Sequence, residues 1–448
     1  MKREVAGAGP TVTEREPFGR AELEWLVELM AVASVSPFEG GRAEATGVAQ
    51  GVFLAGARAR GFRQVLLGSP PADFLDAPDV PATVRDAVRD EPAGFLAGQP
   101  SSVVALGRAD AGPERRLVVN FHLDTVGPHI DPSVTTGPFG VLRGRGAVDD
   151  KGPGIAAAAG IAAAFAAAPW LAETIEVQLQ AVAGEEGGAM GSYGTRWLVS
   201  RGLTGRLMLF AEPTGGRVMD ACTAAMTPRF RVNGKDSTDD HPAYGHNATV
   251  ILGFLADFLA RRLGPRAAEL GAKLCVAGLH TGDAHNRVYG TGELLLNIAY
   301  QNAGQAAELA QALEALLPLA RAEFAAAHAD NPLTAVAVAD WDTVVSLDWL
   351  KRGLPVLDNR DPAMESLLAD VGFARHDGLA DGSAFTCDAI WAPGPGRYVA
   401  VCGPGRLDTN GAHTPGEFVA LADLADYARR IKELVLRFGA ALTEETNR

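Results

Sequence analysis

Apolar residues recur along the chain with a helical period in some stretches and as short β-rich runs in others. Helical spacing predicts helices over 20–34 and 42–61, whereas the runs SSVVALG and RLVVNFHLD predict strands. The stretch KGPGIAAAAGIAAAFAAA is apolar almost all round, which predicts a buried helix with Pro153 near its first turn. Further strands are predicted at IEVQLQAVAGEE and RLMLFAEPT. This alternation predicts an α/β domain with a mixed, mainly parallel sheet.

The pattern changes near residue 221. From there a strand, a helix, two strands, a helix and a strand follow, which is the order of a ferredoxin-like unit. The corresponding segments are MTPRFRVNG, 244–262, AKLCVAGLHTG, ELLLNIAY, 304–328 and LTAVAVADWD. After that unit, helices over 361–372 and 417–438 resume the first domain around the strand RYVAVCGPG.

The order of elements predicts one domain inserted into another. We expect residues 1–220 and 344–448 to form the larger domain and residues 221–343 the inserted one. The segment 69–100 is rich in proline and acidic residues, and we expect a surface insertion there with one short helix.

Composition narrows the class of protein. A chain of 448 residues with a formal net charge of −14 has room for two domains and disfavours a broad nucleic-acid surface. The four cysteines are far apart and form no CxxC pair, which is typical of a reducing compartment. Neither a signal-peptide core near the N-terminus nor an uncharged membrane span is present in the sequence. We therefore expect a cytoplasmic protein without nucleic-acid or membrane partners.

Acidic and histidine side chains stand where predicted strands end and, in GAVDD, directly before the predicted buried helix. Because functional groups gather at the carboxyl ends of strands in open α/β sheets, we expect these side chains to share one cleft. Several ionised carboxylates in one cleft need counter-charge, which divalent metal ions supply. Mixed histidine and carboxylate ligands suit zinc, cobalt or manganese better than magnesium or calcium. The side chains concerned are His122, Asp124, Asp149, Glu185, Glu186, Glu212 and His413.

Five motifs, HLDTV, GRGAVDDKG, GEEGG, AEPT and GPG…GAHTPGEFV, occur in this order over most of the chain. In this order they resemble the dizinc family of acetylornithine deacetylase, succinyl-diaminopimelate desuccinylase, aminoacylase and glutamate carboxypeptidase. The resemblance implies a phosphorylase/hydrolase-like catalytic domain and an inserted ferredoxin-like domain that acts as a lid and pairs subunits. It therefore implies a homodimer that acts on a small-molecule substrate.

The resemblance also implies roles for the strand-end residues. Glu185 would be the general base, and Asp124 would orient a metal-bound histidine. The peptide bond between Asp149 and Asp150 would be cis. Two divalent ions are implied, zinc first, with cobalt or manganese as alternatives. The implied ligands are His122 and Glu212 for one ion, Glu186 and His413 for the other, and Asp149 for both.

Two positions in the inserted domain depart from the family pattern. Thr238 stands where the family has a histidine that stabilises the oxyanion, often in the partner's site, and His241 and His246 are the alternatives for that role. Ala299 stands where the family has an arginine that grips the substrate carboxylate. The residues left as candidates for substrate binding are Asn286, which matches the family's asparagine, together with Arg287, Arg229, His241 and Thr238.

These residues predict a metal-dependent amidohydrolase that acts on an N-acyl amino acid or a related small molecule. Glu212 favours a deacylase or aminoacylase, since the dipeptidase and tripeptidase branches tend to carry aspartate at that position. A carboxypeptidase or dipeptidase of the same family is the first alternative. The others are the same fold recruited to amide formation or transfer, and a metal-binding protein without hydrolytic activity.

Overall fold

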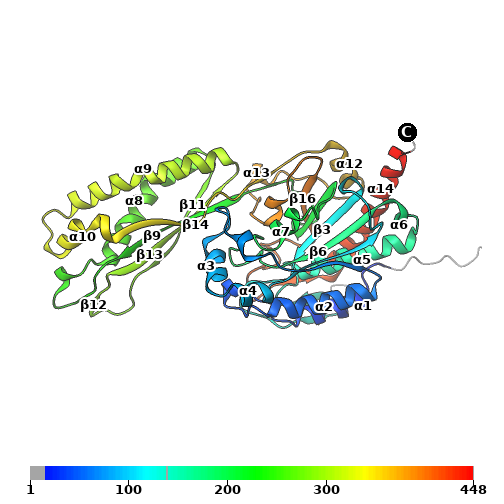
Figure 1. Ribbon diagram of the computed structural model, residues 1–448, viewed down its shortest axis with the longest axis horizontal. Coiled ribbons are helices and arrows are strands. Elements are labelled where there is room, and N and C mark those ends of the chain that lie inside the picture. The colour runs from blue at the N-terminus through cyan, green and yellow to red at the C-terminus, as the bar shows by residue number, and fades with distance from the viewer. Residues whose placement is uncertain (1–15, 138–139, 447–448) are drawn as a thin grey trace, which may run out of the picture.

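The core of the larger domain is a six-stranded sheet in the order β1-β2-β6-β3-β7-β16 (Figure 1). The computed structural model describes residues 16–137 and 140–446. Three neighbouring pairs of strands are parallel, namely β6 with β3, β3 with β7, and β7 with β16. In contrast, β2 is antiparallel to both β1 and β6. The predicted mixed, mainly parallel sheet is therefore confirmed. Its strands are β1 (Arg63–Gly68), β2 (Ser101–Gly107), β3 (Arg116–His122), β6 (Glu176–Val182), β7 (Leu207–Pro213) and β16 (Tyr398–Gly403).

The alanine-rich helix α5 (Lys151–Ala167) is buried over most of its length, as its sequence predicts. A Cβ atom on Gly154 would lie 2.1 Å from the Phe121 ring, so glycine at this position lets α5 approach β3 closely. α5 also packs against α1 (Arg20–Met30) and α14 (Leu421–Thr446), and α2 (Ala45–Ala59) lies beside α1 (Figure 1). This packing fixes the position of the chain just before α5.

Residues 69–100 form more structure than expected. They contain a short 3₁₀ turn (Ala72–Leu75), α3 (Ala82–Asp90) and α4 (Pro92–Gly98). Apolar side chains of this segment, among them Val84 and Val88, are buried in a cluster with Tyr193. The expectation of one short helix is wrong, because the segment forms two helices whose buried side chains build a small core against the segment after β6.

The inserted unit contains a four-stranded sheet in the order β11-β13-β9-β14, with α8 and α9 over one face (Figure 1). The order of its elements along the chain is the predicted ferredoxin-like order. The bounds are β9 (Ala224–Asn233), α8 (Ala248–Glu269), β11 (Lys273–His280), β13 (Thr291–Tyr300), α9 (Ala303–Ala327) and β14 (Val345–Lys351).

The last strand of this unit lies later in the chain than predicted. LTAVAVADWD forms a 3₁₀ turn (Pro332–Thr334) and the helices α10 (Ala335–Ala339) and α11 (Trp341–Val344), so the strand predicted there is wrong. Asn331 caps this helical stretch by accepting a hydrogen bond from the Leu333 N–H, and alanine favours helix over strand. The domain boundaries stay a prediction. β14 extends the inserted sheet beyond residue 343, and residues 1–15 and 447–448 lie outside the described residues.

The remaining helices and strands are short. None of the described helices combines the length and the apolar character needed to cross a membrane. The short elements are β4 (Ser133–Thr135), β5 (Val141–Arg143), α6 (Leu171–Thr174), α7 (Thr195–Ser200), β8 (Ala221–Cys222), β10 (Ser237–Thr238), β12 (Arg287–Val288), β15 (Leu357–Asp358), α12 (Pro362–Asp370), α13 (Gly378–Asp381) and β17 (Phe418–Ala420).

Candidate metal centre

The predicted site residues meet at the carboxyl edge of the parallel strands. His122 is the last residue of β3, and Glu212 lies next to the end of β7. The turn after β6 carries Glu185 and Glu186, and the loop after β16 carries His413. The two aspartates of the DDKG motif directly precede α5 and are buried. The strand ends therefore bring these side chains together at one edge of the sheet.

The Asp149 carboxylate lies between the two histidines. Its Oδ1 atom is 2.9 Å from His122 Nε2, and its Oδ2 atom is 3.1 Å from His413 Nε2. His122 Nε2 is also 3.7 Å from a Glu212 oxygen, and His413 Nε2 is 3.3 Å from a Glu186 oxygen. Two groups of potential ligands therefore meet at one shared carboxylate.

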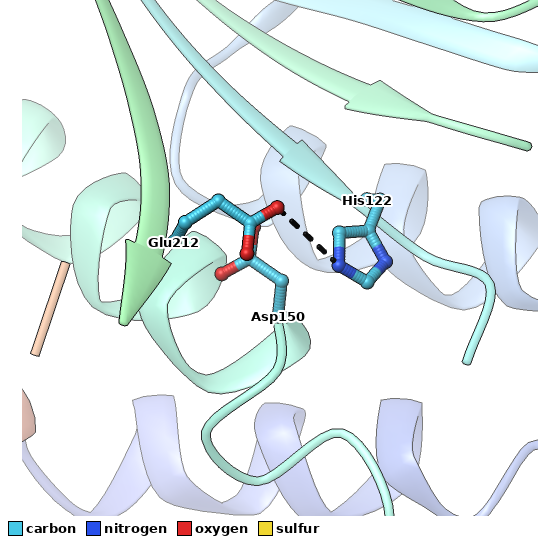
Figure 2. Close-up of side chains that lie close together, drawn as sticks. All are labelled: His122, Asp150 and Glu212. Carbon is cyan, nitrogen blue, oxygen red and sulfur yellow. Dashed lines mark ion pairs between the residues drawn. The ribbon is translucent and has the colours of Figure 1, made fainter. Parts of the chain in front are cut away.

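Asp150 belongs to the same cluster, although no motif in the sequence predicts a role for its side chain. Figure 2 shows its carboxylate beside Glu212, with the His122 ring facing them. One potential ligand atom from each of these three buried residues lies within 4.8 Å of the others. A second such group consists of His122, Asp149 and Glu186. The Asp149–Asp150 peptide bond is cis, as the family resemblance implies.

The charges of the cluster do not balance within the described protein. Burial raises the pKa of Glu185, and the adjacent Glu186 carboxylate raises it further. Burial and the Asp149 carboxylate likewise raise the pKa of Glu212. Hydrogen bonds to Asp149 and Glu186 raise the pKa of His413 to about 10. Positive charge is what this group of side chains lacks.

The donor set fits divalent metal ions. Both carboxylate oxygens of Asp150 are buried without a hydrogen-bond partner in the described structure, which is costly for a polar group. Imidazole nitrogens and carboxylate oxygens around a shared carboxylate are suitable ligands for zinc, cobalt or manganese. The chain thus provides a site that could hold such ions.

Asp124 supports the cluster through two different groups. Its backbone oxygen lies 2.7 Å from His122 Nδ1, so Nδ1–H donates there and Nε2 is left for a ligand. Its carboxylate accepts hydrogen bonds from the N–H groups of Gly184 at 2.9 Å and Glu186 at 3.0 Å. Asp124 therefore contacts His122 through its carbonyl, while its carboxylate holds the turn that carries Glu185.

A buried ion pair that the sequence analysis missed fixes the chain before Asp149. Glu417 accepts a hydrogen bond from Arg145 Nη1 at 2.6 Å. Its other oxygen accepts from the N–H groups of Val148 at 3.1 Å and Asp149 at 3.3 Å. Both residues stand inside the family motifs, but a pairing across 272 residues is visible only in the fold.

A further buried carboxylate was also missed. Asp388 lies within hydrogen-bonding distance of the Thr195 hydroxyl at 2.5 Å. Burial raises the pKa of Asp388 to about 6, although the Thr195 hydrogen bond and the nearby His122 oppose this shift. No motif in the sequence analysis pointed to this residue.

The predicted substrate-binding residues of the inserted unit are not brought to the metal cluster within one chain. Thr238, His241, Asn286 and Arg287 are exposed, and β12 lies at the end of this unit away from the central sheet (Figure 1). His246 is buried instead. Its Nδ1 accepts a hydrogen bond from the Lys235 N–H at 2.7 Å, and its Nε2 lies 3.1 Å from an Asp340 oxygen.

The larger domain has a mainly parallel sheet with two histidines and several buried carboxylates at its carboxyl edge, and a ferredoxin-like unit interrupts it. This combination is typical of a class of metal-dependent hydrolases. A family model, peptidase family M20/M25/M40, matches residues 118–437. The chain belongs to this family, which confirms the resemblance seen in its motifs.

Individual relatives are more distant. The chain is 30% identical over 207 residues to a protein of Aeropyrum pernix named as a LysW-lysine/LysW-ornithine hydrolase. That alignment covers 45% of this chain and 53% of the relative, so the chain spans about half the length of the curated relative it matches.

Among solved structures, a tripeptidase from Staphylococcus aureus is similar with a TM-score of 0.64 and 15% identity, covering 94% of this chain and 98% of that one. A metallo-carboxypeptidase from Sulfolobus solfataricus gives a TM-score of 0.58 at 13% identity, covering 94% and 99%. At these identities the similarity shows a shared fold.

Replacing Glu417 with glutamine should destabilise the protein strongly. Glu417→Gln leaves the buried Arg145 guanidinium without its counter-charge, and breaking a buried pair costs about 3–5 kcal/mol. Chemical denaturation of the metal-free variant measures this loss. The matched control is Glu24→Gln, which removes an exposed ion pair with Arg20 and should leave the unfolding midpoint unchanged. Equal midpoints for the two variants would show that the Arg145–Glu417 pair does not stabilise the fold.

Proposed function

We propose that this protein is a dimetal hydrolase that cleaves the amide bond of an N-acyl amino acid or a related small molecule. The observation that supports the proposal most is the Asp149 carboxylate, each oxygen of which faces a different histidine. Asp149 can thereby serve two ions at once. In the proposal, His122 and Glu212 complete one metal site, and Glu186 and His413 complete the other.

The proposed ions are divalent, with zinc first and cobalt or manganese as alternatives. When bound, two such ions polarise the scissile carbonyl and lower the pKa of an attacking water. Glu185 is the proposed general base. Its half-buried carboxylate has no hydrogen bond or ion pair within the described residues, and its pKa is raised by burial and by Glu186. It accepts a proton from the attacking water and delivers it to the leaving amine nitrogen.

The proposed substrate class is that of a deacylase or aminoacylase. Glu212 at the end of β7 supports it, and so does the relative named as a hydrolase of LysW-lysine and LysW-ornithine. A panel of N-acetyl, N-formyl and N-succinyl amino acids and dipeptides, assayed with added zinc or cobalt, tests the assignment. We expect hydrolysis of N-acyl amino acids. Faster turnover of the dipeptides would favour the peptidase alternative, and no turnover of any member would contradict the proposed activity.

A homodimer and a cytoplasmic location are also part of the proposal. β11 forms one edge of the inserted sheet and exposes Val276 and Leu279, which are 41% and 44% exposed. An apolar sheet edge of this kind is a surface on which a second copy can pair. The location rests on the four described cysteines, all of which are free thiols.

The first prediction from the proposal concerns metal content. Because the ligand groups meet at Asp149, we expect two divalent ions per chain in fully active protein. Elemental analysis of protein reconstituted with zinc measures the ratio. A ratio of one or less in active protein would contradict the paired site.

A second prediction concerns the general base. Glu185→Gln should keep both ions but lower turnover by about 10²–10⁴-fold, because general acid–base help is lost. Steady-state kinetics together with elemental analysis measures both quantities. Glu24→Gln, far from the cluster in an exposed pair, is the control and should retain wild-type turnover. Activity of Glu185→Gln within a factor of two of wild type would exclude this role.

The third prediction concerns assembly. If β11 and α8 pair two copies about a two-fold axis, sedimentation at micromolar concentration should give the mass of a dimer. Val276→Lys combined with Leu279→Lys places charge on the exposed edge and should give monomers. Monomeric wild-type protein under the same conditions would exclude the proposed dimer.

A further inference from the structure

The inserted sheet has one covered face and one open face. Met226, Phe230 and Leu296 point to the covered side and are buried under α8 and α9. The neighbouring residues of the same strands point to the opposite side, because side chains alternate along a strand. Ala299, at the position where the family has its arginine, lies on this open face with Asn297.

A bulge in β14 puts Lys351 on the open face. Trp349 pairs with Pro228, but Lys351 pairs with Thr227, so one extra residue of β14 lies between these two pairs. In a regular strand, the side chains of residues two apart point to the same face of the sheet. Without the bulge, the side chain of Lys351 would therefore point to the covered face, as that of Trp349 does. The one-residue shift reverses its direction. Lys351 therefore shares the open face with Thr227, whose hydroxyl contacts the Asn297 side chain at 3.3 Å.

Lys351 stands at the junction of the two domains. It is the last residue of β14, and this strand contacts α3 of the larger domain (Figure 1). Its side chain is half-buried and forms no hydrogen bond or ion pair with any described residue. Burial lowers the pKa of Lys351, while the Glu185 carboxylate raises it. The ammonium group therefore lies within the electrostatic reach of the proposed general base.

The other cations of this face already have partners. Arg229 forms a two-point contact with Asp348 at 2.8 and 3.1 Å. Arg231 lies 3.4 Å from the same carboxylate, and Lys273 donates to the Gly382 carbonyl at 3.2 Å. Arg287, another cation considered from the sequence, pairs with Asp236. Within the described open face, Lys351 is thus the cation left without a partner.

We propose that Lys351 binds the substrate carboxylate, in place of the arginine that is absent at position 299. The inference rests on the proposed function, because it takes an amide of an amino acid as the substrate. A half-buried ammonium without a counter-ion is suited to an incoming anion, and a charge-assisted hydrogen bond supplies the attraction. Lys351 would then set specificity without taking part in proton transfer.

The test compares N-acetyl-L-methionine with N-acetyl-L-methioninamide, which differ in the carboxylate. Kinetics of zinc-loaded protein should show a kcat/KM roughly 10–100-fold higher for the carboxylate in wild type, the factor that a hydrogen bond to a charged group supplies. Lys351→Met should abolish the preference for the carboxylate probe, mainly by raising the KM for that probe. Lys351→Arg keeps the positive charge and should retain most of the preference. Lys273→Met, which removes a lysine already bonded to a carbonyl, is the matched control and should keep it.

A second readout does not depend on turnover. Calorimetric titration of the metal-free proteins with both probes should show the same preference in wild type and its loss in Lys351→Met. An equal preference in wild type and Lys351→Met would overturn the proposal. A lower kcat of Lys351→Met for both probes, together with a shifted pH profile of kcat, would also overturn the proposal, because Lys351 would then act through Glu185. Absence of hydrolysis by wild type, with the calorimetric preference intact, would instead contradict the proposed function and leave the carboxylate site standing.

Discussion

Crowding of like charge is the constraint on which the rest of the structure depends. Asp149, Asp150, Glu186 and Glu212 are buried at one edge of the central sheet, with imidazoles as their charged neighbours. A buried carboxylate without counter-charge is costly, so the cluster requires cations and a rigid frame. The frame comes from Glu417, which accepts hydrogen bonds from the N–H groups of Val148 and Asp149, and from the carboxylate of Asp124, which holds the turn after β6. The small residues of α5 let the aspartates sit this deep.

The sequence was sufficient for the parts of the site that follow from local pattern. An apolar run that ends in His122 or Glu212 predicts a strand with a ligand at its carboxyl end, and parallel strands bring such ends together. The same pattern predicted the mixed sheet and the order of elements in the inserted unit. It failed at LTAVAVADWD, where alternating apolar residues resemble a strand but a capped, alanine-rich stretch folds as helices.

Other features depend on contacts that no local pattern contains. The Arg145–Glu417 pair joins segments far apart in the chain. Asp388 begins a short 3₁₀ helix (Asp388–Trp391) that carries no metal-site motif, and its carboxylate accepts a hydrogen bond from Thr195. The face of the inserted sheet to which the Lys351 side chain points depends on a single extra residue in β14. A one-residue change of register moves a side chain to the other face of a sheet, so a sequence-based strand assignment accurate to a few residues cannot decide which face carries the charge. A residue proposed to set specificity is thus harder to predict from sequence than the residues proposed to hold metal.

The central claim is that Asp149 joins two metal sites, and anomalous diffraction from crystals of the zinc-loaded protein tests it most directly. Data collected on both sides of the zinc absorption edge locate each ion without reference to the protein atoms. We predict two anomalous peaks about 3.5–4 Å apart, one on each side of the Asp149 carboxylate. A single peak, or two peaks of which one lies away from Asp149, would contradict it.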